Sequence, residues 1–237
     1  MKANVRRWLP SSPVDGPGNR FVVFFQGCNL NCLYCHNPET IDISNEDSSD
    51  EYELNLDELV KEIEKRQDFI TGVTFSGGEC TLQLEALEYL TTKIKALNLD
   101  VIVDTNGHMS KSRFQELLEF TDKLIFDMKA FDEQEHKSLT GHSNRLILSN
   151  IMEALEANKV YEIRVVVVPE IMDNERNVEK AAFMIAQSSP KTQLKLIKFR
   201  DHGVRETEVT MTSPDDDYME VLKEIAANVG VENIVVV

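Results

Sequence analysis

Three of the four cysteines in this 237-residue chain, Cys28, Cys32 and Cys35, stand within eight positions. The spacing C-x3-C-x2-C, directly after a predicted strand, lets one loop wrap three thiolates around a single cluster. A 4Fe-4S cluster held entirely by protein needs a fourth ligand, and this loop contains no fourth cysteine. The sequence therefore predicts an iron–sulfur cluster with one iron open to a substrate or cofactor.

Two other interpretations of the cysteine loop start from the same residues. His36 would be a fourth ligand if the metal were zinc, but Cys35 and His36 are adjacent and would bind one ion awkwardly. A disulfide is the weakest interpretation, because four cysteines are too few for a disulfide scaffold. We favour the cluster over both.

Polar residues also follow other predicted strands. Gly78 and Glu79 end the apolar run that begins at Val73, and glycine there would let a ligand approach the backbone closely. Glu79 could then meet a ligand amino group. A tight turn explains the glycines about as often as a ligand does.

Two further strands end in acidic motifs, Asp-Thr-Asn-Gly from Asp104 and Asp-Met-Lys from Asp127. A single acid at such a place is usually a helix cap or a turn former. Because the carboxyl ends of parallel strands meet at one edge of a sheet, two acids with Lys129 favour a polar pocket there.

Short apolar runs that alternate with amphipathic stretches must position these residues. Strands are expected at Phe21–Gln26, Gly72–Phe75, Asp100–Asp104, Lys123–Asp127, Glu162–Val168, Gln193–Lys198 and Asn233–Val237. Helices are expected at Leu56–Phe69, Leu82–Leu97, Lys111–Phe120, Ile147–Asn158, Asn174–Ala186 and Ser213–Val229. The β–α rhythm predicts an α/β fold with a parallel sheet, either doubly wound or curled into a partial barrel.

Two local patterns refine this expectation. Leu84, Leu87, Leu90 and Ile94 share one face of a helix, and the run Val165–Val168 suits a strand buried on both faces. No linker rich in Pro, Gly or Ser divides the chain, so residues 1–237 are expected to form a single domain. The acidic stretch 41–58 is expected to be a solvated loop that leads into a helix.

Composition limits the partners. The net charge of −16 argues against a nucleic-acid surface and against an anionic membrane, since both need clustered Lys and Arg. No apolar run approaches the roughly 20 residues that span a bilayer, and the first residues lack the apolar core of a signal peptide. A cytoplasmic protein is expected.

Taken together, the motifs resemble those of radical S-adenosylmethionine enzymes. More narrowly, they resemble the activating enzymes of glycyl radical enzymes, the pyruvate formate-lyase activating enzymes among them. The matching segments, in the family's order over nearly the whole chain, are Val14–Arg20, Phe25–Cys28, Tyr34–Pro38, Ser76–Glu79, Asp104–Gly107, Asp127–Lys129 and Arg164–Pro169.

The resemblance implies a partial (β/α)6 barrel of the TIM-like, radical SAM type. It also implies that the open iron of one 4Fe-4S cluster chelates the amino and carboxylate groups of S-adenosylmethionine. One electron then cleaves the sulfonium to methionine and a 5′-deoxyadenosyl radical. The radical takes a hydrogen atom from one backbone glycine of a partner glycyl radical enzyme.

The resemblance also implies roles for individual residues. Gly78 and Glu79 would face the methionyl amino group, Lys129 would face the carboxylate, and Cys28, Cys32 and Cys35 would hold the cluster. The remaining positions implied to lie beside the cofactor are Tyr34, His36, Asp127 and Met128. Asp104, Thr105 and Asp127 match positions that can hold a monovalent cation, and Asp15 lies in the segment that helps to receive the partner's glycine loop.

The expected partners are a glycyl radical enzyme and a flavodoxin- or ferredoxin-type electron donor, with the chain itself a monomer. Two alternatives are a radical enzyme that acts on a small molecule and a non-catalytic iron–sulfur electron carrier. The Asp-Gly-Pro-Gly segment from Asp15 argues against a small-molecule substrate.

The chain departs from the family pattern at two places. The interval 41–70 holds no cysteine, so we expect a single cluster and no ferredoxin-like insert. After the sixth strand, Arg200 takes the place of a histidine that contacts the cofactor, and His202 falls two residues later. Which of these two contacts the cofactor stays open.

Several other residues are given structural roles. Cys80 is expected to be a small buried filler, and Trp8 to anchor the N-terminal segment. Three histidines in polar surroundings are expected at the surface: His108, His136 and His142.

Overall fold

The computed structural model describes residues 1–42 and 52–237, which fall into two compact units. Unit 1 comprises residues 1–29, 39–105 and 110–124, and unit 2 comprises residues 30–38, 106–109 and 125–237. The border between them falls within strand β6 (Lys123–Asp127). The expectation of a single domain over residues 1–237 stays a prediction.

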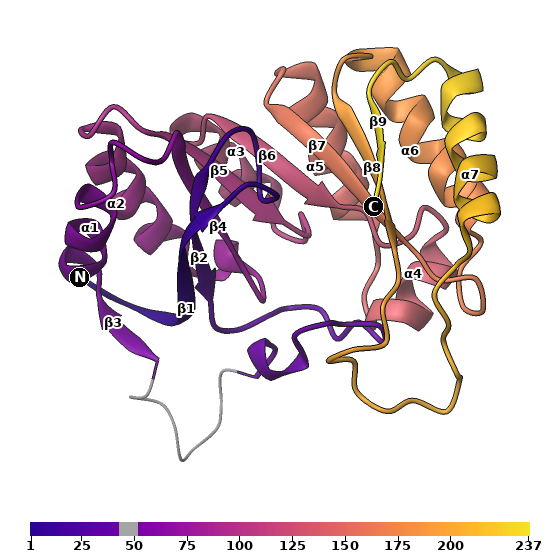
Figure 1. The fold of residues 1–237 in the computed structure, drawn as a ribbon, viewed down its shortest axis with the longest axis horizontal. Helices are drawn as coiled ribbons and strands as arrows, with labels where there is room; N and C mark the ends of the chain where they lie inside the picture. The colour runs from indigo at the N-terminus through magenta and orange to yellow at the C-terminus, as the bar shows by residue number, and fades with distance from the viewer. Residues whose placement is uncertain (43–51) are drawn as a thin grey trace. The chain divides into compact units, whose positions relative to one another are not determined.

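Strands and helices alternate along the chain (Figure 1). The strands are β1 (Lys2–Ser12), β2 (Arg20–Phe25), β3 (Glu53–Asn55), β4 (Gly72–Gly77), β5 (Asp100–Thr105), β6, β7 (Val160–Val167), β8 (Gln193–Lys198) and β9 (Ile234–Val236). The helices are α1 (Leu56–Glu64), α2 (Leu84–Lys95), α3 (Lys111–Phe120), α4 (Glu133–Thr140), α5 (Arg145–Glu156), α6 (Asn174–Ser188) and α7 (Asp216–Val229), with short 3-10 helices η1 (Pro38–Thr40) and η2 (Cys80–Gln83).

The strand order is β3-β1-β2-β4-β5-β6-β7-β8-β9. Strand β1 pairs antiparallel with β2 and β3, whereas β2–β4, β4–β5, β7–β8 and β8–β9 are parallel. The predicted α/β class with a parallel sheet is therefore confirmed. Among the described residues, no helix is long and apolar enough to cross a membrane.

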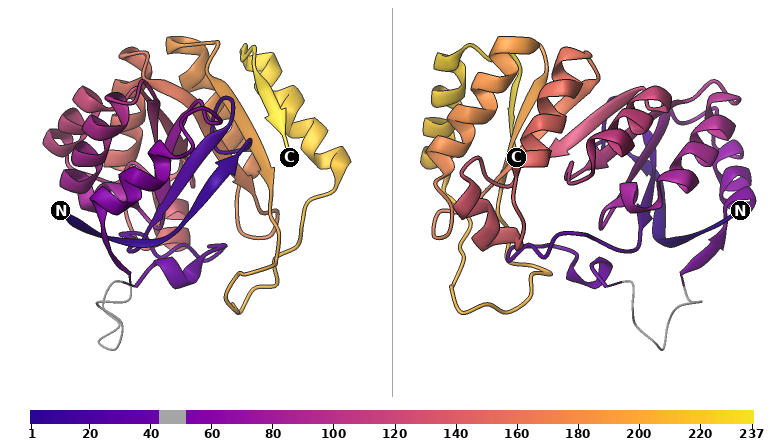
Figure 2. Two further views of the ribbon diagram at one scale, coloured as in Figure 1. Left: turned by 60° about the vertical axis from the view of Figure 1, so that its left-hand side comes forward. Right: turned by 180° about the vertical axis from the view of Figure 1, so that it is seen from behind.

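In unit 1, helices α1, α2 and α3 lie on one face of the strands (Figures 1 and 2). The predicted apolar face of α2 is confirmed, because its four members are all buried: Leu84, Leu87, Leu90 and Ile94. At the sheet, Phe25 of β2 and Phe75 of β4 meet edge to face with ring centroids 5.8 Å apart. This core holds the carboxyl ends of β2, β4 and β5 in fixed register.

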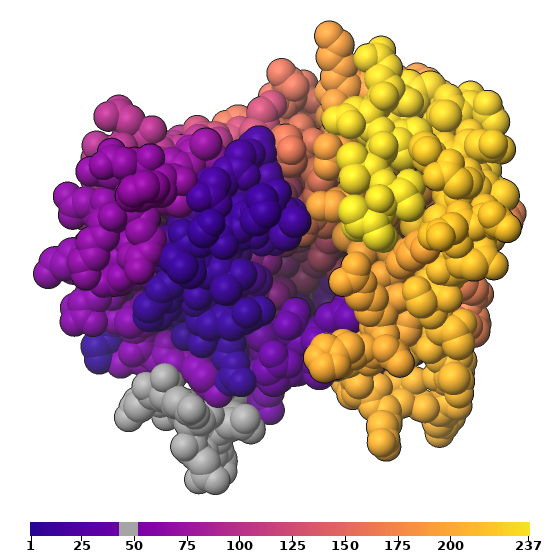
Figure 3. Space-filling view, viewed as in Figure 1, coloured from indigo at the N-terminus to yellow at the C-terminus, as the bar shows by residue number. Residues whose placement is uncertain are grey.

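In unit 2, helices α5, α6 and α7 pack along β7, β8 and β9 (Figure 2). Figure 3 shows the C-terminal part, with α7 and β9 in yellow, at the surface of this unit. Strand β7 is not buried on both faces throughout, since Val165 and Val167 are buried but Val166 is half-exposed; Val168, which follows the strand, is buried. The polar side chains Glu162 and Arg164 lie on the same strand and pair at 2.5 Å.

The sequence did not predict strands β1 and β3 or helix α4. Strand β1 carries charged and polar residues on both faces, and α4 has only eight residues with little apolar patterning. Of the acidic stretch 41–58, residues 43–51 lie outside the described residues. Of the remainder, residues 41, 42 and 52 lie outside helices and strands as expected, and helix α1 starts at Leu56 as predicted, but the expectation of a loop is wrong for residues 53–55, which form β3.

Candidate active site

In unit 1, the ends of β2 and β4 approach each other closely. The Gly78 amide donates to the Phe25 carbonyl at 3.1 Å, and the Glu79 amide donates to the Gly27 carbonyl at 2.7 Å. A Cβ atom on Gly78 would lie 2.3 Å from the Gly27 oxygen, so only glycine fits there. These contacts bring the backbone of Glu79 next to the peptide group that joins Gly27 to Cys28. The amide of Cys28 in turn donates to the Ile41 carbonyl at 3.0 Å.

Glu79 is buried and joins two strand ends. Its Oε1 atom accepts hydrogen bonds from the Thr81 amide at 3.1 Å, the Thr81 hydroxyl at 2.6 Å and the Thr105 hydroxyl at 2.8 Å. Glu79 therefore caps helix η2, and it also faces the end of β5. Beside it, the Ser76 hydroxyl donates to Asp104 at 2.9 Å. Unit 1 thus gathers Gly78, Glu79, Asp104 and Thr105 at one edge of its strands.

Cys80 lies in the core behind this edge. The thiol contacts the carbonyl oxygens of Phe75 at 3.6 Å and Asp104 at 3.4 Å, and no part of Cys80 is exposed. Burial, with the nearby Glu79 and Asp104 charges, raises the pKa of Cys80 well above its ordinary value. The prediction that Cys80 is a small buried filler is confirmed.

Asp15 lies in a loop that buried side chains support. Its carboxylate accepts from the Ser12 hydroxyl at 2.5 Å, and its carbonyl accepts from the Thr74 hydroxyl at 2.7 Å. Thr74 in turn accepts from Arg20 Nε at 3.2 Å, and Arg20 is fully buried. The conformation of the Asp-Gly-Pro-Gly segment is thereby tied to β2 and β4.

In unit 2, Cys32 and Cys35 are half-buried free thiols in one turn, where the Cys35 amide donates to the Cys32 carbonyl at 3.3 Å. Between them Tyr34 is buried in an apolar cluster with Leu139, Val168, Phe199 and neighbouring side chains. Within the described residues, the Tyr34 hydroxyl has no hydrogen-bond partner. Burial raises the pKa of Tyr34 far above its ordinary value, so the ring stays neutral.

Lys129 and Asp127, at the end of β6, form an ion pair of 3.0 Å. The Lys129 ammonium also lies 5.8 Å from the centroid of the Tyr34 ring. Burial alone would lower the pKa of Lys129, but Asp127, Tyr34 and Cys32 raise it well above its ordinary value. Burial likewise raises the pKa of Asp127, yet Lys129 and Arg164 outweigh it and hold that pKa below the usual value. Both groups are therefore charged at neutral pH.

The neighbouring Met128 has a buried side chain, and its backbone links the end of β6 to β7. Its amide donates to the Arg164 carbonyl of β7 at 2.9 Å. The orientation of His36 is set by the residues that follow β8, since its Nε2 atom is 2.8 Å from the Arg200 carbonyl and its ring centroid lies 5.7 Å from that of Phe199. The side chains of Arg200 and His202 are exposed, and the cofactor contact predicted for one of them stays open.

The donor set fits a cationic iron–sulfur cluster. Cys32 and Cys35 are free thiols, and cysteine thiolates are the ligands that hold such clusters. Burial raises the pKa of Cys32 above its ordinary value, and the charges of Lys129 and Arg205 oppose that shift only in part. Tyr34, in the same loop, has a buried hydroxyl for which the described part of the chain offers no hydrogen-bond partner. Across residues 1–42 and 52–237, no three His, Cys, Asp or Glu side chains are arranged to hold a single metal ion.

Two features of unit 2 differ from the expectations or were missed. His136 is buried, so the prediction of a surface histidine is wrong for it, because the undetected helix α4 turns it inward. His108 is half-buried, and His142 is exposed as predicted. Arg205, which contacts the cysteine loop, was missed because it lies in a segment without helical or strand periodicity.

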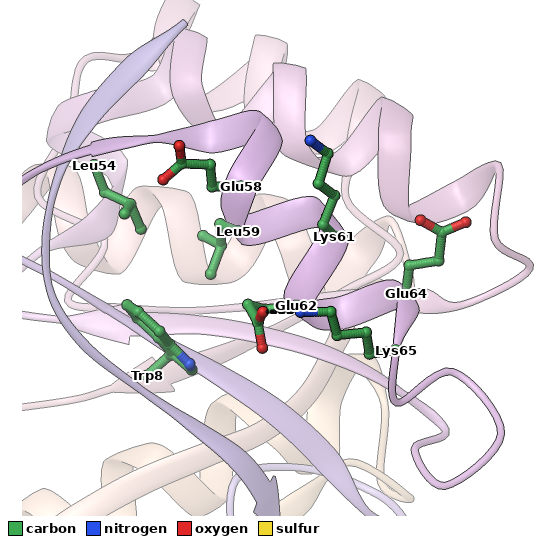
Figure 4. Close-up of a pocket in the computed structure, with 8 residues that line it drawn as sticks. All are labelled: Trp8, Leu54, Glu58, Leu59, Lys61, Glu62, Glu64 and Lys65. Atoms are coloured by element: carbon green, nitrogen blue, oxygen red, sulfur yellow. Dashed lines mark hydrogen bonds and ion pairs between the residues drawn. The ribbon is translucent and has the colours of Figure 1, made fainter.

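Trp8 lies at a separate hollow of unit 1, of about 600 Å³. Figure 4 shows its ring beside Leu54 of β3 and Leu59 of α1, with Glu62 and Lys65 paired at the rim. The indole is 38% exposed, so it covers the apolar side of α1 only in part. The expected anchoring role of Trp8 stays a prediction.

Comparison with known proteins bears on this arrangement. The model of the Radical SAM superfamily matches residues 22–182. A putative glycyl-radical enzyme activating enzyme of Haemophilus influenzae is 32% identical, over 98% of this chain and 96% of its own length. A pyruvate formate-lyase-activating enzyme of Clostridium pasteurianum is 35% identical, over 82% of this chain and 81% of its own. Among solved structures, a domain of pyruvate-formate lyase-activating enzyme from Bacteroides vulgatus matches with a TM-score of 0.60 and 25% identity, covering 70% of this chain and 98% of that one.

The chain therefore belongs to the radical SAM superfamily and, within it, to the family of glycyl radical enzyme activating enzymes. The predicted fold class, the partial (β/α)6 barrel of that superfamily, is confirmed, and so is the prediction that the chain is an enzyme. Membership implies a 4Fe-4S cluster and S-adenosylmethionine as cofactors.

Proposed function

We propose that this enzyme installs a glycyl radical on a partner glycyl radical enzyme, using one 4Fe-4S cluster held by Cys28, Cys32 and Cys35. When bound, the cluster and S-adenosylmethionine supply a 5′-deoxyadenosyl radical that takes a hydrogen atom from the partner's glycine. The observation that carries the proposal is the pair Lys129–Asp127 beside the buried Tyr34 and the free thiols Cys32 and Cys35.

In unit 2, the proposed binding residues are the charged pair Lys129 and Asp127 and the aromatic ring of Tyr34. Lys129 is a point charge suited to the methionyl carboxylate, and its partner Asp127 keeps it protonated and oriented. Tyr34, within the cysteine loop, offers a neutral ring and a hydroxyl that has no hydrogen-bond partner among residues 1–42 and 52–237. We assign His36, Met128 and Cys35 to the same cofactor-binding set.

In unit 1, the residues supply acceptors. Gly78 allows the end of β4 to approach the Gly27 carbonyl, and this approach positions Glu79, whose buried carboxylate is proposed to face the methionyl amino group. Asp104 and Thr105 are proposed, with Asp127 of unit 2, as ligands of a monovalent cation. Oxygen ligands of this kind suit hard cations.

Asp15 is proposed to receive the glycine loop of the client. Its backbone is held by Thr74 and its carboxylate by Ser12, so the loop is fixed before a partner arrives. The proposed electron donor is a flavodoxin- or ferredoxin-type protein, and the proposed state is a cytoplasmic monomer.

An electron paramagnetic resonance experiment tests the proposal. The reconstituted enzyme is reduced without oxygen and mixed with S-adenosylmethionine and a candidate glycyl radical enzyme. A glycyl radical signal that requires all components supports the function. A partner that stays silent, while an established activating enzyme produces the signal in it, counts against the pairing.

A control addresses the client loop. The variant Asp15→Asn should retain cleavage of S-adenosylmethionine but form less glycyl radical. If Asp15→Asn forms the radical as fast as the unaltered enzyme, Asp15 does not receive the glycine loop.

A further inference from the structure

Arg205 lies in the segment between β8 and α7, which is orange in Figure 3 and reaches the surface there. Its Nη2 atom donates to the Asn31 carbonyl at 2.9 Å and to the Cys32 carbonyl at 2.7 Å. One guanidinium nitrogen therefore bridges two consecutive peptide groups of the cysteine loop. The contact uses only backbone atoms of the loop, so it fixes the path of the chain at Cys32.

The end of α4 also holds this loop. The amides of Asn31 and Leu33 donate to the carbonyls of Thr140 at 3.0 Å and Leu139 at 2.9 Å. Gly141, in the left-handed conformation with φ of 84°, ends the helix there. The last carbonyls of a helix have no partner within it, and here the cysteine loop supplies one.

The two supports carry opposite charge. The C-terminus of α4 brings partial negative charge to the loop, whereas Arg205 brings a full positive charge that does not titrate in the physiological range. Negative charge beside an iron–sulfur cluster disfavours its reduced form, because reduction adds an electron. Positive charge favours the reduced form.

We propose that Arg205 is a positioning residue that fixes the cysteine loop and that its charge raises the reduction potential of the cluster bound there. The inference rests on the proposed function, because it requires the cluster at Cys32. It makes one-electron reduction by a donor protein easier than the helix end alone would allow.

Arg205 can be replaced by another side chain without steric conflict. Arg205 borders a hollow of about 600 Å³ that is also lined by Leu33, Ile171, Val209 and Met211. A shorter side chain would therefore lose the two hydrogen bonds without crowding its neighbours. Arg205→Gln removes the charge, and Arg205→Lys retains it.

Lys191 provides a matched control. It is exposed and precedes β8, whereas Arg205 follows that strand, so the two residues stand at opposite ends of β8. Lys191→Gln makes the same change in net charge as Arg205→Gln and leaves the cysteine loop untouched.

The first measurement is the midpoint potential of the reconstituted cluster, from a redox titration followed by electron paramagnetic resonance without S-adenosylmethionine. At the midpoint of the unaltered protein, the ratio of reduced to oxidised cluster should fall severalfold in Arg205→Gln. The ratio should stay near that of the unaltered protein in Arg205→Lys and Lys191→Gln. An unchanged potential in Arg205→Gln with a full cluster overturns the electrostatic role.

The second measurement is amide hydrogen exchange in the cluster-free protein. The peptide that contains Asn31–Cys35 should exchange faster in Arg205→Gln than in Lys191→Gln, and equal exchange overturns the positioning role. Because it uses cluster-free protein, this measurement tests the positioning role even if Arg205→Gln takes up no cluster. If the unaltered protein itself forms no cluster, the proposed function fails, and that outcome is distinct from a failure of either Arg205 variant.

Discussion

Replacement of Arg20 by methionine should destabilise unit 1 more than any exchange of an exposed charge. The Arg20 side chain is completely buried, pairs with Asp100 at 2.5 Å and donates to the Val73 carbonyl at 2.7 Å and the Thr74 hydroxyl at 3.2 Å. Methionine fills most of the same volume but makes none of these contacts. The Val73 carbonyl would be left buried without this donor.

The size of the effect follows from these contacts. Removing one partner of a buried ion pair costs roughly 3–5 kcal/mol, but the Asp100 side chain is 44% exposed and can be hydrated again. Hydrogen bonds from a charged group contribute about 1.5–3 kcal/mol. We therefore expect the free energy of unfolding to fall by about 3 kcal/mol.

Urea denaturation followed by circular dichroism measures this free energy. Arg113→Gln is the control, because Arg113 and Glu85 form an exposed pair with side chains 38% and 67% accessible. Such a pair contributes less than about 1 kcal/mol. A double variant Arg20→Met/Asp100→Asn should be little worse than Arg20→Met, because Asp100 acts through Arg20. An Arg20→Met protein that unfolds within about 1 kcal/mol of the unaltered one would refute the reasoning.

Three further outcomes are expected. Burial lowers the pKa of His136 below its ordinary value of 6.5, so the unfolded chain binds an extra proton as the pH falls through that range. The unaltered protein should therefore lose stability between pH 7.5 and 5.5 by denaturant titration, and His136→Gln should lose less; parallel profiles would contradict this. Gly78→Ala should unfold about 1–3 kcal/mol more easily, because the added Cβ would lie 2.3 Å from the Gly27 carbonyl, and an unchanged urea midpoint would argue against that close approach. Lys129→Met should keep its cluster but bind S-adenosylmethionine roughly 10-fold or more weakly by calorimetry, since one charged hydrogen bond is lost; equal affinity would remove Lys129 from the carboxylate site.

The sequence predicted the parallel core of the fold well. Strand β6 and helix α3 match their predicted bounds, because each is a short apolar or amphipathic run with clear ends. Strand β1 was missed because it carries charged and polar residues on both faces, and its stability comes from pairing with β2 and β3 rather than from a local apolar pattern. Helix α4 was missed for a related reason, since it is short and polar and is capped by Asp132.

The residues of the candidate site likewise fall into those that the sequence predicted and those that it did not. Spacing alone marks Cys32 and Cys35, and strand ends mark Lys129, because these signals are local in the chain. Arg205 reaches the cysteine loop across more than 170 positions of sequence, and no periodicity signals that contact. The burial of His136 likewise depends on packing that α4 acquires only in the folded unit.

Cleavage of S-adenosylmethionine by the anaerobically reconstituted and reduced protein tests the central claim most directly. The unaltered protein should bind iron and sulfide as one 4Fe-4S cluster and produce 5′-deoxyadenosine and methionine. Cys32→Ala should lose both the cluster and the cleavage, whereas Cys80→Ala should retain them, because Cys80 is fully buried in the core. Binding of zinc without iron, or cleavage that survives in Cys32→Ala, would contradict the account.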